Sequence, residues 1–419
     1  MRTSLGVEDA LRTVLDSTPV LGPETVSART ALGRVLAESV VSSRVLPPDD
    51  CSAMDGYAVR RSDLRGACAD RPVHLKVGFE IAAGARPGAR TLGPGESARI
   101  FTGAPVPLGC DAVVRQEDTE SRDDGVLVRV EPEAREHIRD AGEDIGAGDR
   151  VLAPGTVVGA PELGLMASVG RSVAAVHQKP RVAILSGGDE LVEPDRDPSG
   201  GRIVSSNSYA LAGQCLSAGA EPIYLGIARD RPDDIKQHLQ AGLRADCIVS
   251  SAGVSVGDKD FVRAVLLELG CEFDFWGVQM KPGFPMAFGR FRGAELPLVF
   301  GLPGNPVSAM VTFEQFVRPA LRKMMGHRSW YRPTVQAILT QSLEKTAGRL
   351  HFVRVTLSRS GGQFHATSTG NQSSGVLSSM SQADGLLVFP ADATKLSAGE
   401  HATVQVLNDD VLANPHPAF

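Results

Sequence analysis

Five short segments between residues 186 and 308 bring together glycine-rich turns and serine, lysine and acidic side chains. Glycine permits tight turns whose backbone N–H groups can approach an anion, and serine hydroxyls at helix starts add further donors. Turns of this kind are typical of phosphate-binding loops. The segments are 186–190 (SGGDE), 229–230 (RD), 251–260 (SAGVSVGDKD), 281–285 (KPGFP) and 302–308 (LPGNPVS).

Acidic side chains in these segments, those of Glu190, Asp230, Asp258 and Asp260, would repel a bound phosphate. The repulsion is removed when a hard cation such as Mg²⁺ lies between carboxylates and phosphate, which is how Mg²⁺ is usually bound. The segments therefore indicate a metal-bridged nucleotide or pyrophosphate. An alternative is that Asp and Ser cap helices while Gly and Pro make turns. A single segment favours this alternative, whereas the five together favour a ligand site.

Apolar strands alternate with helical segments between Arg181 and Leu321, and this alternation predicts a mostly parallel sheet. Ligands of such sheets bind beyond the carboxyl ends of the strands, so we expect the five segments to meet at one edge. The expected strands are 181–185, 222–228, 246–250, 273–278 and 297–301, and the expected helices lie near 207–218, 232–243, 260–269 and 306–321.

The rest of the chain predicts an α/β multi-domain protein. Helical spacing of apolar residues over 7–20 and 24–39 predicts an amphipathic opening, and short β-like runs dominate both 46–136 and the chain after Pro333. A further helix is expected at 161–170. The expected domains are a discontinuous helical and extended linker domain (1–46 and 138–179), a β-rich domain (47–137), a central α/β domain (180–328) and a C-terminal β domain (329–419).

Charge and composition exclude several classes of partner. The chain has 419 residues and a formal net charge of −6, with an isoelectric point near 5.9, which argues against an extended nucleic-acid surface. It contains no apolar run of about 18 residues, so neither a membrane span nor a signal peptide is expected, and the expected compartment is the cytoplasm. Its cysteines and histidines follow no zinc-ligand spacing.

Two N-terminal motifs and one charged run are ambiguous by themselves. Asp55 in SAMDGYAV and Thr102 in IFTGAP fit a turn as well as a functional site, while the run 138–145 (IRDAGEDI), which contains Asp144, favours a charged turn.

Seven motifs, in order, give the chain an end-to-end resemblance to the molybdopterin molybdenumtransferase family, which comprises the bacterial MoeA proteins and the E domain of gephyrin. They are SAMDGYA, FTGAPVPLGCDAVV, GEDI, SGGDEL, SVGDKD, KPG and LPGNPVS. The resemblance implies an elongated homodimer of four-subdomain chains, with the central domain binding molybdopterin and the linker domain serving dimerisation. It also implies the reaction: molybdate attacks adenylylated molybdopterin and AMP leaves, assisted by a divalent cation, which we expect to be Mg²⁺.

The matched positions imply roles for individual residues. Asp55, Glu190, Asp230 and Asp260 would be catalytic, and the last three would also hold the metal. The substrate-binding set joins matched positions of the family with donors of the glycine-rich turns. It consists of Thr102, Asp144, Ser251, Ser255, Lys281, Asn305, Ser308, Arg349 and Ser374.

Three positions depart from the family pattern. Phe284 stands where KPGKP has a second lysine, Ala252 replaces a glycine of SGGVSVG, and Ser205 replaces the Asp of a D-S-N run. The missing lysine removes a positive charge expected near the oxyanion. It favours two alternatives, a scaffold protein of the same fold or a transferase acting on another oxyanion such as tungstate, whereas the retained carboxylates favour an enzyme over a scaffold.

Overall fold

The computed structural model describes residues 1–86, 88, 90–251, 261–291 and 297–413. The chain divides into two compact units. The larger unit contains Met1–Glu24, Gly33–Ala37 and Val176–Phe419, and the smaller unit contains Thr25–Leu32 and Glu38–Ala175. No helix in the described part of the chain is long and apolar enough to cross a membrane. The division into four domains stays a prediction.

A seven-stranded sheet forms the centre of the larger unit. Its strands are β1 (Arg2–Leu5), β14 (Arg181–Gly187), β17 (Glu221–Ala228), β18 (Cys247–Ser251), β19 (Cys271–Val278), β21 (Ala287–Phe291) and β22 (Leu298–Leu302). They lie in the order β1-β19-β21-β22-β18-β14-β17, and among them only β21 is antiparallel to its neighbours. The mostly parallel sheet expected from the sequence is confirmed. Neither β1 nor β21 was predicted.

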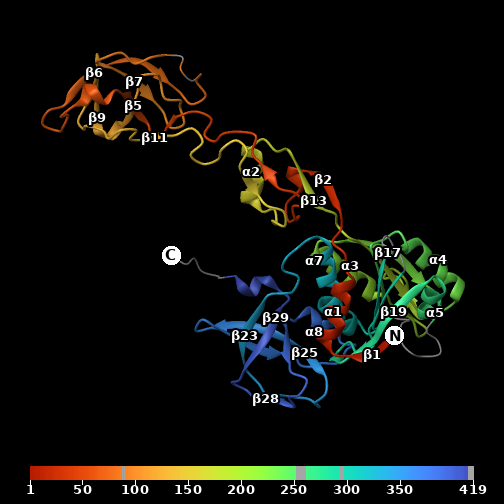
Figure 1. The fold of residues 1–419 in the computed structure, drawn as a ribbon. Coiled ribbons are helices and arrows are strands. Elements are labelled where there is room, and N and C mark those ends of the chain that lie inside the picture. Colours follow the sequence, from red (N-terminus) through yellow and green to blue (C-terminus); the bar gives the residue numbers. More distant parts are fainter. Residues whose placement is uncertain (87, 89, 252–260, 292–296, 414–419) are drawn as a thin grey trace. The chain divides into compact units, whose positions relative to one another are not determined.

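Helices cover both faces of this sheet, as the alternation of buried residues along β14 requires. They are α1 (Val7–Ser17), α3 (Ser206–Ala218), α4 (Pro232–Gly242), α5 (Phe261–Glu268), α6 (Pro306–Thr312), a π-helix (Phe313–Val317) and α7 (Arg318–Met324). Val182 and Ile184 belong to the core that contains α1, α3 and α7, whereas Ala183 and Leu185 belong to the core that contains α4 and α5. Figure 1 shows the two groups of helices on opposite faces. All the helices expected between 207 and 321 are confirmed.

The predicted helix over 24–39 is wrong. The chain instead forms β2 (Pro23–Ser27), a 3₁₀ turn (Ala28–Thr30) and an irregular segment. Gly33 has φ +75°, which ends any right-handed helix in the middle of the range. Val35 and Leu36 are buried without a helix, and Leu36 forms an isolated β-bridge with Val176, whereas Leu32 is exposed.

The C-terminal part of the larger unit is a barrel-like sheet. Its strands are β20 (Met280–Lys281), β23 (Thr334–Leu339), β25 (Leu350–Ser360), β26 (Gln363–Ser368), β27 (Gly385–Phe389) and β29 (His401–Val406). They lie in the order β20-β25-β26-β23-β29-β27, and a further pairing of β25 with β27 closes the ring. The β structure expected after Pro333 is confirmed. Minor elements of the larger unit are β15 (Leu191–Val192), β16 (Ile203–Val204), β24 (Leu343–Glu344), β28 (Lys395–Leu396), α8 (Leu377–Ser381) and a 3₁₀ turn (Asp409–Leu412).

The smaller unit is built on a six-stranded sheet in the order β8-β5-β7-β6-β10-β9. Those strands are β5 (Gly56–Val59), β6 (Val73–Ile81), β7 (Glu96–Ile100), β8 (Ala112–Arg115), β9 (Thr119–Arg122) and β10 (Gly125–Val128). The β-rich character expected for this region is confirmed, as is the helix expected at 161–170. The other elements are β3 (Val40–Val41), β4 (Cys51–Ser52), β11 (Ile138–Arg139), β12 (Arg150–Leu152), α2 (Ala160–Ser168) and two 3₁₀ turns (Arg61–Leu64 and Gln116–Asp118). Strand β13 (Val173–His177) begins in this unit, and its last two residues belong to the larger unit.

Candidate functional site

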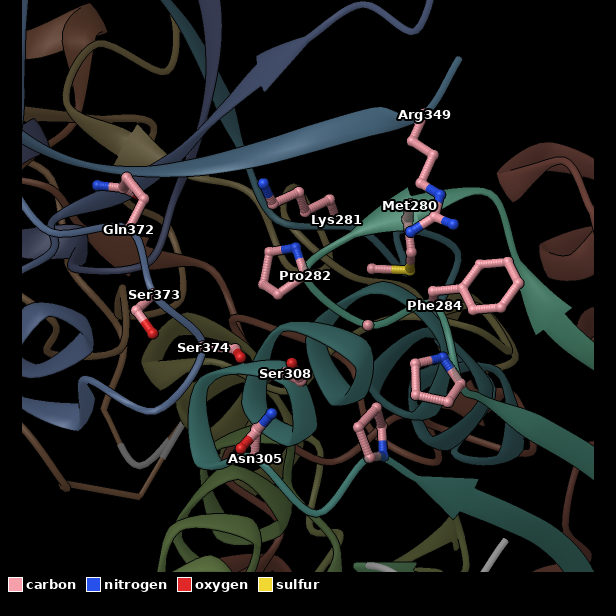
Figure 2. A pocket seen from close by; sticks show the side chains of 13 residues that line it. Met280, Lys281, Pro282, Phe284, Asn305, Ser308, Arg349, Gln372, Ser373 and Ser374 are labelled. Carbon is pink, nitrogen blue, oxygen red and sulfur yellow. The ribbon is translucent and has the colours of Figure 1, made fainter. Parts of the chain in front are cut away.

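A pocket of about 520 Å³ lies in the larger unit where three segments meet: the loop after β20, the start of α6 and the loop 372–374. Figure 2 shows Lys281 and Arg349 on one side of this pocket and Ser308, Ser374 and Asn305 on the other. We call it the site pocket. Its lining consists of Met280, Lys281, Pro282, Gly283, Phe284, Pro285, Pro303, Asn305, Ser308, Arg349, Gln372, Ser373 and Ser374.

The position of Lys281 is set by backbone pairing. β20 runs parallel to β25, which places Lys281 opposite His351, and the N–H of Leu350 donates to Gln279 O at 3.1 Å. The turn that follows needs its glycine: Gly283 has φ +112°, and a Cβ there would lie 2.5 Å from Thr312 Oγ1. The lysine and the turn are therefore fixed against two different parts of the larger unit.

Phe284 brings no positive charge to the pocket, but its ring packs against the guanidinium of Arg349. The Arg349 guanidinium carbon lies 4.3 Å from the centroid of that ring, and Trp276 meets the same ring edge-on with centroids 5.6 Å apart. A guanidinium over an aromatic face is attracted by the ring's negative face, so the stack orders the exposed Arg349 side chain at the pocket. Figure 2 shows Arg349 beside Phe284.

The loop that carries Ser374 is held from beneath by Arg354, a residue that the sequence reasoning missed. Arg354 is fully buried, and its Nη2 donates to the carbonyls of Asn371 at 3.0 Å and Ser373 at 3.2 Å. Its backbone N–H donates to Gln372 Oε1 at 3.0 Å, and the pKa of Arg354 is lowered by burial. The available signal was an arginine inside the apolar run HFVRVTL, where a buried cation requires acceptors.

The start of α6 is tied to the same loop. The N–H of Val307 donates to Ser374 O at 3.1 Å, and Asn207 Nδ2 donates to Gly304 O at 2.8 Å. Ser308 is buried in the first turn of α6, whereas Asn305 is exposed just before it. The structure thus gathers five of the predicted substrate-binding residues around one pocket. They are Lys281, Asn305, Ser308, Arg349 and Ser374.

Two of the predicted acidic residues lie elsewhere, at the carboxyl ends of the adjacent strands β14 and β17. Asp189 joins these two strand ends, because its Oδ1 accepts from the N–H of Asp230 at 3.3 Å and its carbonyl accepts from Arg229 Nη1 at 3.2 Å. Glu190 and Asp230 are both exposed, and neither lines the site pocket. We call the segments 186–190 and 229–230 the acidic edge.

The acidic edge offers hard oxygen donors, which suit Mg²⁺ with water and phosphate oxygens as its other ligands. Within the described ranges, no three His, Cys, Asp or Glu side chains are grouped closely enough to hold a metal ion. The third predicted metal ligand, Asp260, and the predicted donor Ser255 lie outside the described residues. Ser251 is buried at the end of β18 and does not line the site pocket.

The smaller unit brings Asp55 and Thr102 together. Asp55 Oδ1 accepts from the Thr102 N–H at 2.7 Å and from Thr102 Oγ1 at 2.8 Å, and these two hydrogen bonds lower the pKa of Asp55. Asp144 is exposed, and its backbone N–H donates to Leu46 O at 3.1 Å. The same turn contains the ion pair Arg139–Glu143, in keeping with the charged turn expected there.

Fold and pocket together define a multi-domain α/β protein with a pocket lined by two cationic side chains and several hydroxyl and amide groups. Three family matches make the class specific. Residues 5–170 match the MoeA N-terminal region (domain I and II), residues 183–323 match a probable molybdopterin binding domain, and residues 336–407 match the MoeA C-terminal region (domain IV).

Whole-length relatives agree with these matches. The chain is 39% identical to a molybdopterin molybdenumtransferase of Nostoc sp., covering 91% of this chain and 88% of that relative. It is 39% identical to molybdopterin molybdenumtransferase 2 of Mycobacterium tuberculosis, with coverages of 95% and 98%. A crystal structure of the molybdopterin biosynthesis MoeA protein of Pyrococcus horikoshii superposes with a TM-score of 0.80 at 30% identity, covering 96% of this chain and all of that one (100%). The chain therefore belongs to the MoeA family of molybdopterin molybdenumtransferases.

Proposed function

We propose that this protein inserts molybdate into adenylylated molybdopterin and releases AMP, assisted by a divalent cation that we take to be Mg²⁺. The observation that carries the proposal is the site pocket, in which two cations face hydroxyl and amide donors. Membership of the MoeA family supports the choice of molybdopterin as the acceptor and of molybdate as the oxyanion.

The residues of the site pocket suit a tetrahedral dianion. Lys281 and Arg349 supply two positive charges, and the hydroxyls of Ser308 and Ser374 supply neutral donors from the opposite side. Charge-assisted hydrogen bonds are about twice as strong as neutral ones. Donors fixed before the reaction stabilise developing charge without reorganisation at the moment of transfer. In this proposal the pocket holds molybdate beside the dithiolene and stabilises the charge that develops on its oxygens.

The acidic edge suits the divalent cation. Glu190 and Asp230 would hold it, with Asp260 as the third ligand expected from the sequence. When bound, Mg²⁺ would polarise the phosphoryl group of the pyrophosphate-like bond and neutralise charge on the leaving AMP. The chain's own contribution is the Asp189 hydrogen bond, which links the ends of the neighbouring strands β14 and β17. The exposed carboxylates of Glu190 and Asp230 follow these two strand ends.

The direct test supplies purified protein with adenylylated molybdopterin, Mg²⁺ and molybdate and follows AMP release. We expect release that rises with molybdate concentration and fails when Lys281 is replaced by Ala. The matched control is Lys179→Ala, which removes an exposed lysine just before β14, at the opposite end of that strand from the acidic edge. AMP release that does not depend on molybdate would overturn the proposal.

We also propose that the protein is a homodimer. The support is a group of exposed apolar side chains on α3 and on β17, which is the edge strand of the described sheet. Tyr209 and Leu216 are 58% and 64% exposed, and Ile223 and Tyr224 are 41% and 43% exposed. Apolar groups gathered at a sheet edge are typical of association surfaces. Light scattering should give twice the chain mass of 44.2 kDa, with Leu216→Glu shifting it toward the monomer; a monomer for the unmodified chain would contradict the proposal.

A further inference from the structure

Arg99, in the smaller unit, contacts the chain next to both members of the pair Asp55 and Thr102. It belongs to β7 and is paired with Tyr57 of β5 in the sheet. Its guanidinium carbon lies 5.1 Å from the centroid of the Tyr57 ring and 5.1 Å from that of the Phe101 ring. Each ring attracts the cation through its negative face, so the two rings together hold the guanidinium in one position.

The hydrogen bonds of Arg99 lead to the backbone around Asp55. Its Nη1 donates to Gly56 O at 3.1 Å, and its Nη2 donates to Gln116 Oε1 at 2.8 Å. The backbone N–H of Gln116 in turn donates to Asp55 O at 3.1 Å. Gly56 lies so close to the neighbouring strand that a Cβ on it would be 1.9 Å from Val114 O. Arg99 therefore fixes the peptide groups that follow Asp55, one directly and one through Gln116.

The stack on Phe101 fixes the other member of the pair. Phe101 precedes Thr102, whose N–H and Oγ1 donate to Asp55 Oδ1 at 2.7 Å and 2.8 Å. Asp55 and Thr102 are 47 residues apart in the sequence, and Arg99 contacts the residue next to each of them. Both hydrogen bonds from Thr102 end on Oδ1, so Oδ2 keeps its acceptor capacity for an N–H or O–H group of a ligand.

The positive charge of Arg99 acts on Asp55 because its direct contacts are to neutral groups. Within the described residues these contacts are two aromatic rings, a carbonyl and an amide oxygen. Glu80 is opposite Arg99 on β6, but its exposed side chain forms no ion pair with it in the described ranges. The two hydrogen bonds from Thr102 are the main causes that lower the pKa of Asp55, and the charge of Arg99 lowers it further. A nearby opposite charge favours the ionised form of a carboxyl group.

We propose that Arg99 is a positioning residue for Asp55, because it joins the turn that carries Asp55 to the segment that carries Thr102. A guanidinium offers a rigid fork of donors, so one side chain can hold Gly56 O and Gln116 at the same time. The placing of the carboxylate by Arg99 rests on these contacts alone. That Asp55 then acts on the substrate rests on the proposed function, in which its free oxygen would bind a donor group of adenylylated molybdopterin.

The test compares the unmodified protein with Arg99→Gln and Arg99→Lys by NMR, without substrate. In Arg99→Gln the titration midpoint of Asp55 should rise, because a nearby positive charge is lost. Hydrogen exchange of the Thr102 amide should become about tenfold faster, since the carboxylate that accepts its N–H is no longer held in place. Arg99→Lys keeps the charge but not the fork of donors. It should therefore keep the low midpoint of Asp55, while exchange at Thr102 is still faster than in the unmodified protein.

Arg129→Gln is the matched control, since Arg129 is exposed in the same unit and pairs with Glu120 of β9. It should change neither the midpoint of Asp55 nor the exchange of Thr102. If Arg99→Gln also leaves both quantities unchanged, the proposal is overturned, even where its thermal unfolding midpoint falls, because Arg99 would then stabilise the fold alone. Should Arg99→Gln fail to fold, Arg99→Lys decides the question, and an unchanged exchange rate at Thr102 overturns the proposal.

Turnover gives a further readout of the same role. In the AMP-release assay, Arg99→Gln should lower kcat by about tenfold with little change in KM for molybdate, because Arg99 acts on a residue outside the site pocket. The acid limb of the pH profile should move to higher pH, since a carboxyl group with a raised midpoint is protonated earlier as the pH falls. A raised KM with an unchanged kcat would contradict the proposal. If the unmodified protein shows no molybdate-dependent AMP release, the proposed function fails, whereas the NMR measurements still decide the role of Arg99.

Discussion

The site pocket and the acidic edge belong to the same unit but are prepared to different degrees. The pocket is fixed before any ligand arrives: Phe284 holds Arg349, and Arg354 holds the loop of Ser374. At the acidic edge, the side chains of Glu190 and Asp230 are exposed, and the two strand ends are linked by hydrogen bonds of Asp189 and by the Gly188 N–H, which donates to Ala228 O at 3.1 Å.

The difference shows that sites for an anion and for a cation can be ordered to different degrees before their ligands bind. Cations without anionic partners can be ordered in advance by aromatic rings and carbonyl groups, which do not neutralise them. Carboxylates that must ligate Mg²⁺ repel one another until the metal arrives, so pre-assembly would be unfavourable. We therefore expect substitutions at the acidic edge to lower turnover without changing stability. Substitutions around the pocket should weaken oxyanion binding, because its donors would no longer be held in position.

The largest effect is expected at the acidic edge. Glu190→Gln should lower molybdate-dependent AMP release by about 100-fold or more, because a metal ligand contributes several kcal/mol of charge stabilisation in the transition state. The unfolding midpoint should scarcely change, because an exposed side chain contributes about 0.5 kcal/mol or less to stability.

Glu221→Gln is the matched control for that prediction, since Glu221 is exposed at the opposite end of β17. It should leave both AMP release and the unfolding midpoint unchanged. An unfolding midpoint that falls along with the activity of Glu190→Gln would instead support a structural, turn-forming role for the acidic edge.

A smaller effect is expected from the buried support of the pocket. Arg354→Met removes the donor to the carbonyls of Asn371 and Ser373 and should weaken molybdate binding in the site pocket by about tenfold. The stability change should be modest, about 1–2 kcal/mol, because the lost hydrogen bonds are partly offset by no longer burying a charge.

Calorimetry and thermal unfolding measure the two quantities. Arg359→Met is the control, since Arg359 is exposed near the other end of β25 and its guanidinium stacks on Phe364. Unchanged molybdate affinity in Arg354→Met would show that the loop of Ser374 keeps its position without the arginine.

The residues of the acidic edge and the start of α6 could be predicted because they follow apolar strands directly. A strand end followed by Gly, Asp or Ser is visible in the sequence, and parallel strands bring such ends to one edge. Residues from the barrel, Arg349 and Ser374, entered only through the family resemblance, since no local pattern links them to Lys281.

Lys281 is brought close to Arg349 by the pairing of β20 with β25, which could not be predicted from the sequence. A strand of two residues, Met280–Lys281, has no measurable alternation, and its partner lies about 70 residues further along the chain. Arg354 was missed although it lies inside an apolar strand, where a buried cation must have acceptors nearby. The helix predicted over 24–39 was wrong because the prediction relied on the spacing of apolar residues and gave too little weight to Gly33.

The stack beside the pocket gives the next smaller effect. Phe284→Leu keeps an apolar side chain but removes the ring beneath Arg349, and it should weaken molybdate binding about 3- to 10-fold, in line with a cation–π energy of roughly 1 kcal/mol. The Phe284→Tyr variant, which keeps an aromatic ring, should bind molybdate with the same affinity as the unmodified protein. If Leu and Tyr at this position give the same affinity in calorimetry, the ring does not order Arg349.

The smallest effect is expected at Asp55, a carboxylate that is held in advance and so contrasts with Glu190. The Thr102 N–H and hydroxyl both donate to it and lower its pKa, which means that they favour the ionised form. Their contribution to stability is present above the ordinary pKa of an aspartate and is lost as the pH falls through the lowered value.

Thr102→Val keeps the backbone N–H, which is the larger cause, and removes only the hydroxyl. The NMR titration midpoint of Asp55 should therefore rise part of the way toward the ordinary value, whereas Thr102→Ser should leave it low. A midpoint that stays unchanged in Thr102→Val would mean that the backbone hydrogen bond alone holds the carboxylate. Asp55 would then be oriented by the turn rather than by the Thr102 side chain, and the pre-organisation of this pair would not extend to the hydroxyl.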